Sequence, residues 1–192
     1  MEKERLIERL NFVMGKKDCL ALAAYFAEID GGVETLFDLC CSKNETSAFH
    51  SAWVLENVLT ANPDIFALCL GKIVELFPDI ANPSVQRHFS KLLSLGFTAC
   101  SKNQLQKDVC QLLKKLDMEP VVEKCFELLM EPTTKAAVKV HCMDILAHLS
   151  QRYLWVADEL PHVIELQMLT STPALAARGR KVIEAMRKAG YS

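Results

Sequence analysis

The sequence predicts an all-α fold, a right-handed α-α superhelix of about five antiparallel helix pairs, in a single domain over residues 1–192. Three observations support this fold class. Apolar residues recur at helical spacing along almost the whole chain, whereas the alternation typical of strands is nearly absent. Glycine is scarce, at 7 residues, which disfavours long loops and tight hairpins. Similar helical segments also recur roughly forty residues apart.

The expected helices are joined by linkers of only a few residues, so neighbouring helices should pack antiparallel. Their apolar faces are broad. Val138, Cys142, Ile145 and Leu149 form one stripe beside a second apolar stripe, as a helix buried between two neighbours requires. The expected helices span residues 3–14, 17–29, 32–41, 44–60, 63–76, 83–100, 104–116, 119–130, 134–151, 159–170 and 173–188.

A polar residue followed by proline marks three of the expected helix starts. The Asn or Thr side chain accepts a hydrogen bond from a backbone N–H of the first turn. Proline fits the first helical position because its missing N–H would have no partner there. Pro120, Pro132 and Pro161 also fall near expected helix starts. The three capped starts are Asn62-Pro63, Asn82-Pro83 and Thr172-Pro173.

A weak internal repeat is superimposed on this helical pattern. Four segments begin with small or polar residues, carry a basic residue or His about one turn later, and continue as an apolar helix. The second and third of these segments lie farther apart in sequence than the other neighbouring segments do, because an extra helix, near residues 104–116, is expected between them. Helix-pair repeats of roughly 40–47 residues are typical of HEAT and armadillo solenoids. The residues at the shared position are His50, Arg87, Lys139 and Arg178.

Two blocks resemble a known group of proteins: Ser51-Ala52-Trp53-Val54-Leu55-Glu56 and Asn82-Pro83-Ser84-Val85-Gln86-Arg87 are similar to segments of small bacterial HEAT-like (armadillo-type) proteins. The likeness extends over most of the chain. Members of that group sometimes carry the label adenylosuccinate lyase, but the chain has no stretch of that enzyme's S-S-x-M-P-x-K-x-N signature kind. The resemblance therefore implies the fold and supplies no catalytic residues.

A second resemblance, at the level of the fold, is to HEAT-like alkylpurine DNA glycosylases, which use a basic groove with Trp, Tyr and Asp. This chain has 2 Trp and 3 Tyr, and its 22 basic and 24 acidic side chains give a net charge of −2. A strongly basic nucleic-acid binder would have the opposite balance. Nucleic-acid binding is therefore the alternative to the function favoured below.

The 8 cysteines are irregularly spaced, and no pair forms C-x-x-C. Most lie among apolar residues, so buried reduced thiols are expected, with one reactive thiol, and then metal binding or disulfides, as less favoured alternatives. His141, Asp144 and His148 share one helix face, where two of them could bind a metal ion; a solvated polar stripe is the interpretation we favour. No metal or other cofactor is predicted.

Known catalytic motifs are absent from the sequence. There is no Gly-rich phosphate loop, no G-x-S-x-G and no H-E-x-x-H. No catalytic residue is therefore predicted, although an enzyme with an unrecognised pocket stays open. No apolar run is long enough to cross a membrane, and the first residues form a charged helix pattern without a signal-peptide core. We expect a cytoplasmic protein that does not bind membranes.

Charge is unevenly distributed along the chain. Residues 28–79 hold nine acidic and two basic side chains, whereas residues 80–192 hold eleven acidic and fifteen basic ones. Basic side chains at or near the repeat positions could form a ridge that attracts an anionic partner, although scattered solvated charge is the interpretation we favour. The ridge would comprise Arg87, Lys91, Lys139, Arg178, Arg180 and Lys181. The pattern favours a non-catalytic protein–protein interaction scaffold, whose partner is another protein or a second copy. The candidate interaction surface comprises His50, Glu56, Asn57, Arg87, Lys91, Lys139, Asp144, His148, Arg178 and Lys181.

Overall fold

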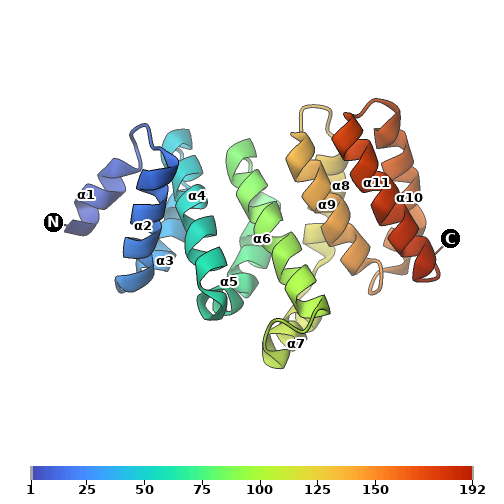
Figure 1. Cartoon of the computed structure of the whole chain (residues 1–192), viewed down its shortest axis with the longest axis horizontal. Helices are drawn as coiled ribbons and strands as arrows, with labels where there is room; N and C mark the ends of the chain where they lie inside the picture. The colour runs from blue at the N-terminus through green and yellow to red at the C-terminus, as the bar shows by residue number, and fades with distance from the viewer. Residues whose placement is uncertain (1, 192) are drawn as a thin grey trace. The chain divides into compact units, whose positions relative to one another are not determined.

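The computed structural model describes residues 2–191, with side chains for residues 4–107 and 109–191. Within this range the chain is helical and has no strand (Figure 1), which confirms the predicted all-α fold class. The elements are α1 (Glu2–Arg9), α2 (Lys16–Glu28), α3 (Gly32–Cys40), α4 (Glu45–Ala61), α5 (Pro63–Leu76), the 3-10 turn η1 (Phe77–Asp79), α6 (Pro83–Ser101), α7 (Lys107–Lys115), α8 (Glu119–Met130), α9 (Ala136–Leu149), α10 (Leu154–Leu169) and α11 (Pro173–Lys188).

Most predicted helix bounds agree closely with these, but those of α1 and α10 do not. α1 ends at Arg9, five residues before the predicted end at 14. α10 departs from its prediction at the start. It begins at Leu154, five residues before the predicted start at 159, so Pro161 lies inside the helix and the expectation that it marks a start is wrong. Burial of Val156 and Leu160 favours helix upstream of the proline. Tyr153 is the N-cap residue of α10. Its hydroxyl accepts a hydrogen bond of 3.2 Å from the backbone N–H of Met118.

Two of the three predicted caps are confirmed. The Asn82 side chain accepts a hydrogen bond of 2.9 Å from the backbone N–H of Ser84, and Thr172 Oγ1 accepts one of 3.4 Å from that of Leu175. The third prediction is wrong. Asn62 Nδ2 donates to the carbonyl of Val58, at 2.7 Å, so this side chain closes the end of α4 instead of opening α5.

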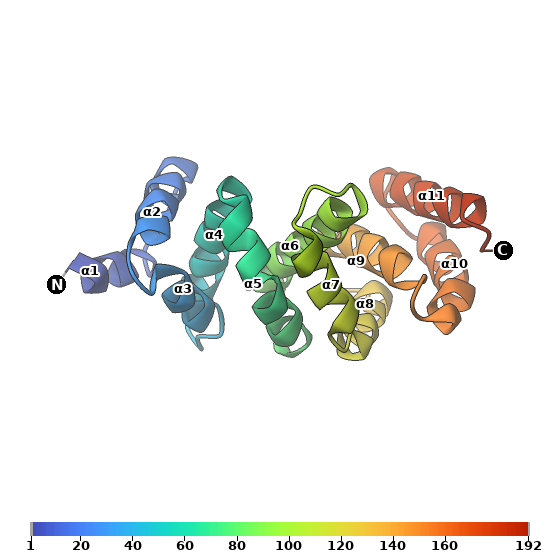
Figure 2. The ribbon, with the colours of Figure 1, turned by 90° about the horizontal axis from the view of Figure 1, so that it is seen from below.

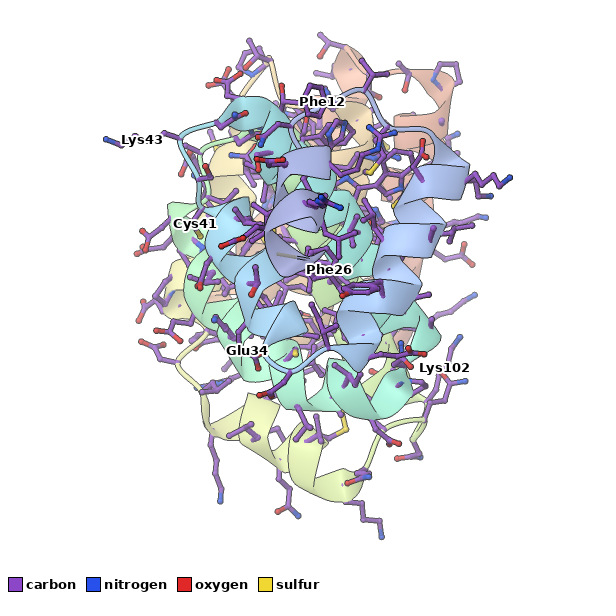
Figure 3. All side chains as sticks on the ribbon, turned by 90° about the vertical axis from the view of Figure 1, so that its left-hand side faces the viewer. Phe12, Phe26, Glu34, Cys41, Lys43 and Lys102 are labelled. Carbon is purple, nitrogen blue, oxygen red and sulfur yellow. A yellow bond between two sulfur atoms is a disulfide. The ribbon has the colours of Figure 1, made fainter. Side chains whose placement is uncertain are left out.

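The chain divides into two compact units. Unit 1 comprises Met1–Cys69 and Ile80–Phe89, and unit 2 comprises Leu70–Asp79 and Ser90–Ser192. In unit 1, α2, α3 and α4 pack on one another. Phe26 is fully buried among them, whereas Lys43 extends outward (Figure 3). Phe37 and Phe89 meet edge to face, with ring centroids 6.1 Å apart. The single-domain organisation stays a prediction.

In unit 2, α9 packs against α8 on one side and α11 on the other, and α10 pairs with α11 (Figure 2). The apolar stripe predicted on this helix is buried, with Val138, Cys142, Ile145 and Leu149 at most 4% exposed. Gly179 lets α11 approach α10 closely. A Cβ added there would lie 2.7 Å from the side chain of Ile164, so a larger residue does not fit without displacement.

The cysteines follow the expectation only in part. Four of the six free thiols are buried, and burial raises the pKa of Cys19 to about 12. Cys100 and Cys110 instead form a disulfide, so the prediction of reduced thiols is wrong for these two. The chain turns back between α6 and α7, and this brings their Cα atoms within 5.6 Å, a distance that a disulfide spans.

Two features concern metal ions and membranes. Over the described residues, no group of three or more His, Cys, Asp or Glu is placed to hold a metal ion. No described helix has the length and apolar character needed to cross a bilayer.

Candidate functional site

Four of the ten predicted surface residues come together in unit 2. Asp144 and His148 lie one turn apart on α9, and Arg178 and Lys181 lie one turn apart on the neighbouring helix α11. All four line a hollow of about 310 Å³, to which Thr98 of α6 also contributes. The packing of α9 against α11 therefore assembles these side chains into one surface, which we call the α9–α11 site.

An ion pair holds this site together. Arg178 Nε donates to Asp144 Oδ1 at 2.8 Å, and Nη2 of the same guanidinium lies 2.6 Å from that oxygen as an ion pair. The Asp144 side chain is only 11% exposed, whereas that of Arg178 is 43% exposed. Charge-assisted hydrogen bonds of this length are the stronger kind, so the guanidinium is held in one orientation while part of it still faces solvent. Asp144 is thus engaged with Arg178.

His148 forms the floor between α9 and the end of α6. Its Nδ1 lies 3.3 Å from Ser101 Oγ, and its ring stacks on Phe97 with centroids 5.9 Å apart. Burial lowers the pKa of His148; the charge of Asp144 opposes this shift and that of Arg178 adds to it. The imidazole is therefore neutral at pH 7 and acts as a hydrogen-bonding group.

The contact between Ser101 and His148 does not make an activated nucleophile. Ser101 Oγ donates its proton to the carbonyl of Phe97 one turn earlier, at 3.0 Å. In this arrangement the hydroxyl proton is directed at the Phe97 carbonyl, and His148 Nδ1 lies 3.3 Å from the hydroxyl oxygen. Ser101 and His148 therefore form part of a hydrogen-bonded network at the end of α6.

The sequence matches a model of the HEAT repeat domain family over residues 6–186. The chain belongs to the HEAT repeat family. This confirms the predicted repeat class and agrees with the paired helices of both units. Searches of curated proteins and of solved structures gave no match.

Within this HEAT repeat chain, the four residues of the shared repeat position do not all face solvent. Arg87 and Arg178 are exposed, but His50 and Lys139 are each only 6% exposed. Lys139 Nζ donates to Gln167 Oε1 at 2.7 Å, which joins α9 to α10. Burial lowers the pKa of Lys139, and Glu131 opposes that shift. The expectation of an exposed basic ridge is therefore wrong for Lys139, because its ammonium group packs inside its repeat.

Predicted residues in unit 1 also serve internal contacts. His50 Nδ1 lies 2.8 Å from the carbonyl of Leu10, which ties α4 to the segment after α1. Asn57 Nδ2 donates to the carbonyl of Trp53 at 2.8 Å and contacts Cys19 Sγ at 3.4 Å. Such buried polar groups usually stabilise packing when they are paired.

Glu56 has a partner that the sequence analysis missed. His88 Nδ1 donates to Glu56 Oε2 at 2.7 Å, and the two side chains are 5% and 13% exposed. His88 lies three residues after Val85 and four before Leu92, on the apolar face of α6. A polar residue on such a face needs a buried partner, and that pattern was the available signal. Lys91, also on α6, is half-buried.

Proposed function

We propose that this chain is a single HEAT-repeat domain that acts as a non-catalytic scaffold and binds a partner protein through the α9–α11 site. The observation that carries the proposal is the assembly of Asp144, His148, Arg178 and Lys181 from two helices around one hollow. The family supports it, because the stacked helices of such repeats are typical interaction scaffolds.

The arrangement of charges suits recognition of a protein surface. Arg178 is oriented before binding by its hydrogen bond and ion pair with Asp144, so little side-chain freedom is lost when a partner docks. Lys181 has no ion-pair partner among the described residues and remains available for a carboxylate. Arginine is enriched among the residues that dominate binding at protein interfaces.

A charge-reversal experiment tests this proposal. Immobilised wild-type protein is compared with Arg178→Glu/Lys181→Glu and with the matched control Arg187→Glu/Lys188→Glu, which changes the same charges on exposed positions of the same helix. Captured proteins are quantified by mass spectrometry. We expect at least one protein to be retained by the wild type and the control and lost by the site variant.

The proposal fails if the site variant retains the same proteins as the wild type. Self-association is the other form of protein binding, and sedimentation velocity separates it from a heterologous partner. A second copy as partner predicts a dimer that the Arg178→Glu/Lys181→Glu variant loses. If the captured species is a nucleic acid, nucleic-acid binding replaces the proposed function. The amount retained would then fall steeply as the salt concentration rises.

A further inference from the structure

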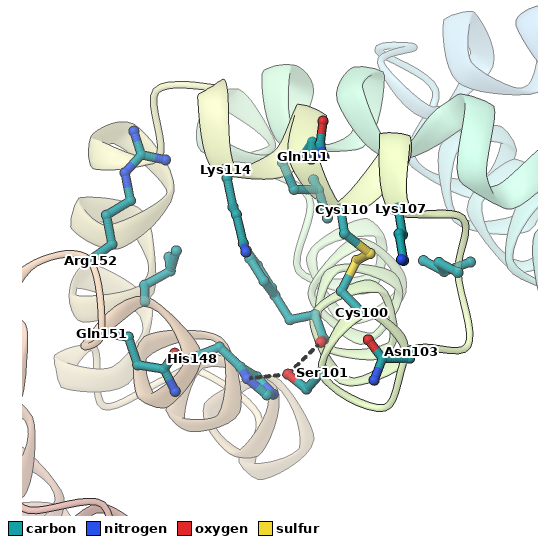
Figure 4. Close-up of a pocket in the computed structure, with 14 residues that line it drawn as sticks. Cys100, Ser101, Asn103, Lys107, Cys110, Gln111, Lys114, His148, Gln151 and Arg152 are labelled. Atoms are coloured by element: carbon teal, nitrogen blue, oxygen red, sulfur yellow. Dashed lines mark hydrogen bonds between the residues drawn. A yellow bond between two sulfur atoms is a disulfide. The ribbon is translucent and has the colours of Figure 1, made fainter.

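A second hollow in unit 2 has a different chemical character. It has a volume of about 860 Å³ and lies between the end of α6, α7 and the end of α9 (Figure 4). Phe97, Leu113 and Leu149 provide its apolar lining. His148 and Gln151 line both this hollow and the α9–α11 site, so the two adjoin.

The charged side chains that the structure describes in the lining of this hollow are all basic. Lys107 and Lys114 of α7 and Arg152, just after α9, line it, and no described lining side chain is a carboxylate. No described side chain forms an ion pair with either lysine. Arg152 is anchored, because its Nη1 donates to the carbonyl of Leu116 at 2.6 Å and its guanidinium lies over the Tyr153 ring. Three cations with no carboxylate among the described lining side chains favour an anionic ligand.

The Cys100–Cys110 disulfide positions two of these cations. Lys107 lies three residues before Cys110 and Lys114 four residues after it, so all three project from one face of α7. The disulfide turns this face toward α6, and Figure 4 shows Lys107 and Lys114 extending from α7 into the space beside it. Both ammonium groups are thus presented by a helix that is covalently held.

We infer that this hollow binds an acidic segment of the partner protein, with carboxylates on the cations and an apolar side chain between them. The inference rests on the proposed function for the nature of the ligand. Lys107 and Lys114 are seven residues apart on one helix, about 10 Å along its axis. A ligand with two anionic groups about that far apart satisfies both lysines, and roughly three residues of extended polypeptide span that distance.

The apolar lining distinguishes this ligand from a nucleic acid. Phe97 is half-buried, while Leu113 and Leu149 are buried, so the floor of the hollow offers contact to an aliphatic or aromatic side chain. A groove that binds nucleic acid needs a row of basic groups that follows the phosphate backbone. This hollow has only three basic residues among its described lining side chains, which is too few for such a row. A peptide in which acidic and apolar residues alternate would place its carboxylates on the basic rim of the hollow and its apolar side chains on the floor.

Fluorescence anisotropy with the purified full-length chain tests the inference. The probe is a labelled peptide of alternating Glu and Leu, compared with the same peptide carrying Gln in place of Glu and with a single-stranded oligothymidylate. Lys107→Gln/Lys114→Gln is matched by Lys102→Gln/Lys115→Gln, which removes two nearby exposed charges outside the hollow. We expect the Glu peptide to bind, and Lys107→Gln/Lys114→Gln to weaken it by about tenfold or more.

The control variant should bind the peptide within about twofold of the wild type. Both double variants lose two positive charges, so an effect of net charge alone would weaken binding equally in both. The inference is overturned if the wild type fails to bind the Glu peptide, if both double variants lose the same affinity, or if the oligothymidylate binds more tightly. Each of these results leaves the proposed function standing as long as Arg178→Glu/Lys181→Glu still loses its partner. Loss of the inference and loss of the proposed function are therefore distinguishable.

Discussion

His88 donates a hydrogen bond of 2.7 Å to Glu56, and this pair joins α6 to α4 inside unit 1. His88 Nε2 has no hydrogen-bond partner among the described residues, so Glu56 carries the polar pairing of this ring. A buried pair of this kind is sensitive to loss of one member, because the remaining group stays desolvated.

Glu56→Ala should therefore lower the free energy of unfolding by about 3 kcal/mol. Urea denaturation followed by circular dichroism measures the change. Glu45→Ala is the control, since Glu45 is exposed in the first turn of the same helix. We expect its effect to stay below about 1 kcal/mol, as for a carboxylate near a helix start. Equal effects of the two substitutions would contradict a special role for the pair.

His148 should make stability depend on pH. Its pKa in the folded protein is lowered from 6.5 by burial, so the unfolded chain binds more protons as the pH falls below 6.5. The free energy of unfolding should consequently decrease as the pH drops through this window, until the folded state is protonated as well. Urea denaturation at about pH 7 and about pH 5.5 measures the decrease.

The comparison that isolates this contribution uses His148→Gln and His162→Gln. His148→Gln should reduce the pH dependence between those two conditions. His162 is exposed on α10, and its replacement should leave the dependence close to that of the wild type. An unchanged pH profile in His148→Gln would show that other groups cause the dependence.

Lys139 should act as a packing residue. Lys139→Met removes the buried charge with little change of volume and should alter the free energy of unfolding by less than about 1 kcal/mol. Gln167→Leu removes the acceptor of its 2.7 Å hydrogen bond and should cost about 2 kcal/mol, because the ammonium group stays buried without that partner. A Lys139→Met protein that loses the captured partner would place this residue in the interface instead.

The disulfide should protect α7 from proteolysis. It closes a loop of ten residues in sequence, which stabilises the closed form by about 3 kcal/mol in the chain-entropy account. An isolated helix of 9 residues is marginal, so Cys110→Ser should expose Lys107, Lys114 and Lys115 to faster trypsin cleavage. The control is Cys41→Ser, which replaces an exposed cysteine outside the disulfide. Equal cleavage rates in the two variants would contradict this role.

Gly179 and Gly71 provide a matched pair of helix glycines. Gly179→Ala places a methyl group 2.7 Å from Ile164 and should destabilise the protein by about 2 kcal/mol. Gly71→Ala meets nothing within 4 Å and should stabilise it by about 0.5 kcal/mol. Thermal denaturation compares the two. A stabilising Gly179→Ala would mean that α11 can move away from α10 at little cost.

The helices could be predicted because their signals are local. The bounds of α5, α8 and α11 agree with the predicted ranges 63–76, 119–130 and 173–188, and each has proline at or near its first position. Pro161 misled the prediction for α10 because the same residue is tolerated inside a helix whose preceding turn is buried.

From the sequence, neighbouring candidate residues could be grouped only where they lie on adjacent helix faces. Asp144, His148, Arg178 and Lys181 were identified from helical spacing and charge, and the packing of α9 on α11 brings them together. His50 was misjudged, since the carbonyl that pairs with it belongs to Leu10, far away in sequence. The disulfide was missed for a related reason: nothing in the cysteine spacing shows that α7 turns back onto α6.

The shared repeat position has an implication for how such chains change over time. The same backbone location carries Lys139 turned inward onto Gln167 and Arg178 turned outward from α11. A substitution at this position can thus change a residue that packs inside the molecule into one that contacts another molecule, without a change in the main chain. Each added hairpin of this kind supplies one more place where a new binding preference can arise while its neighbours keep the stack intact.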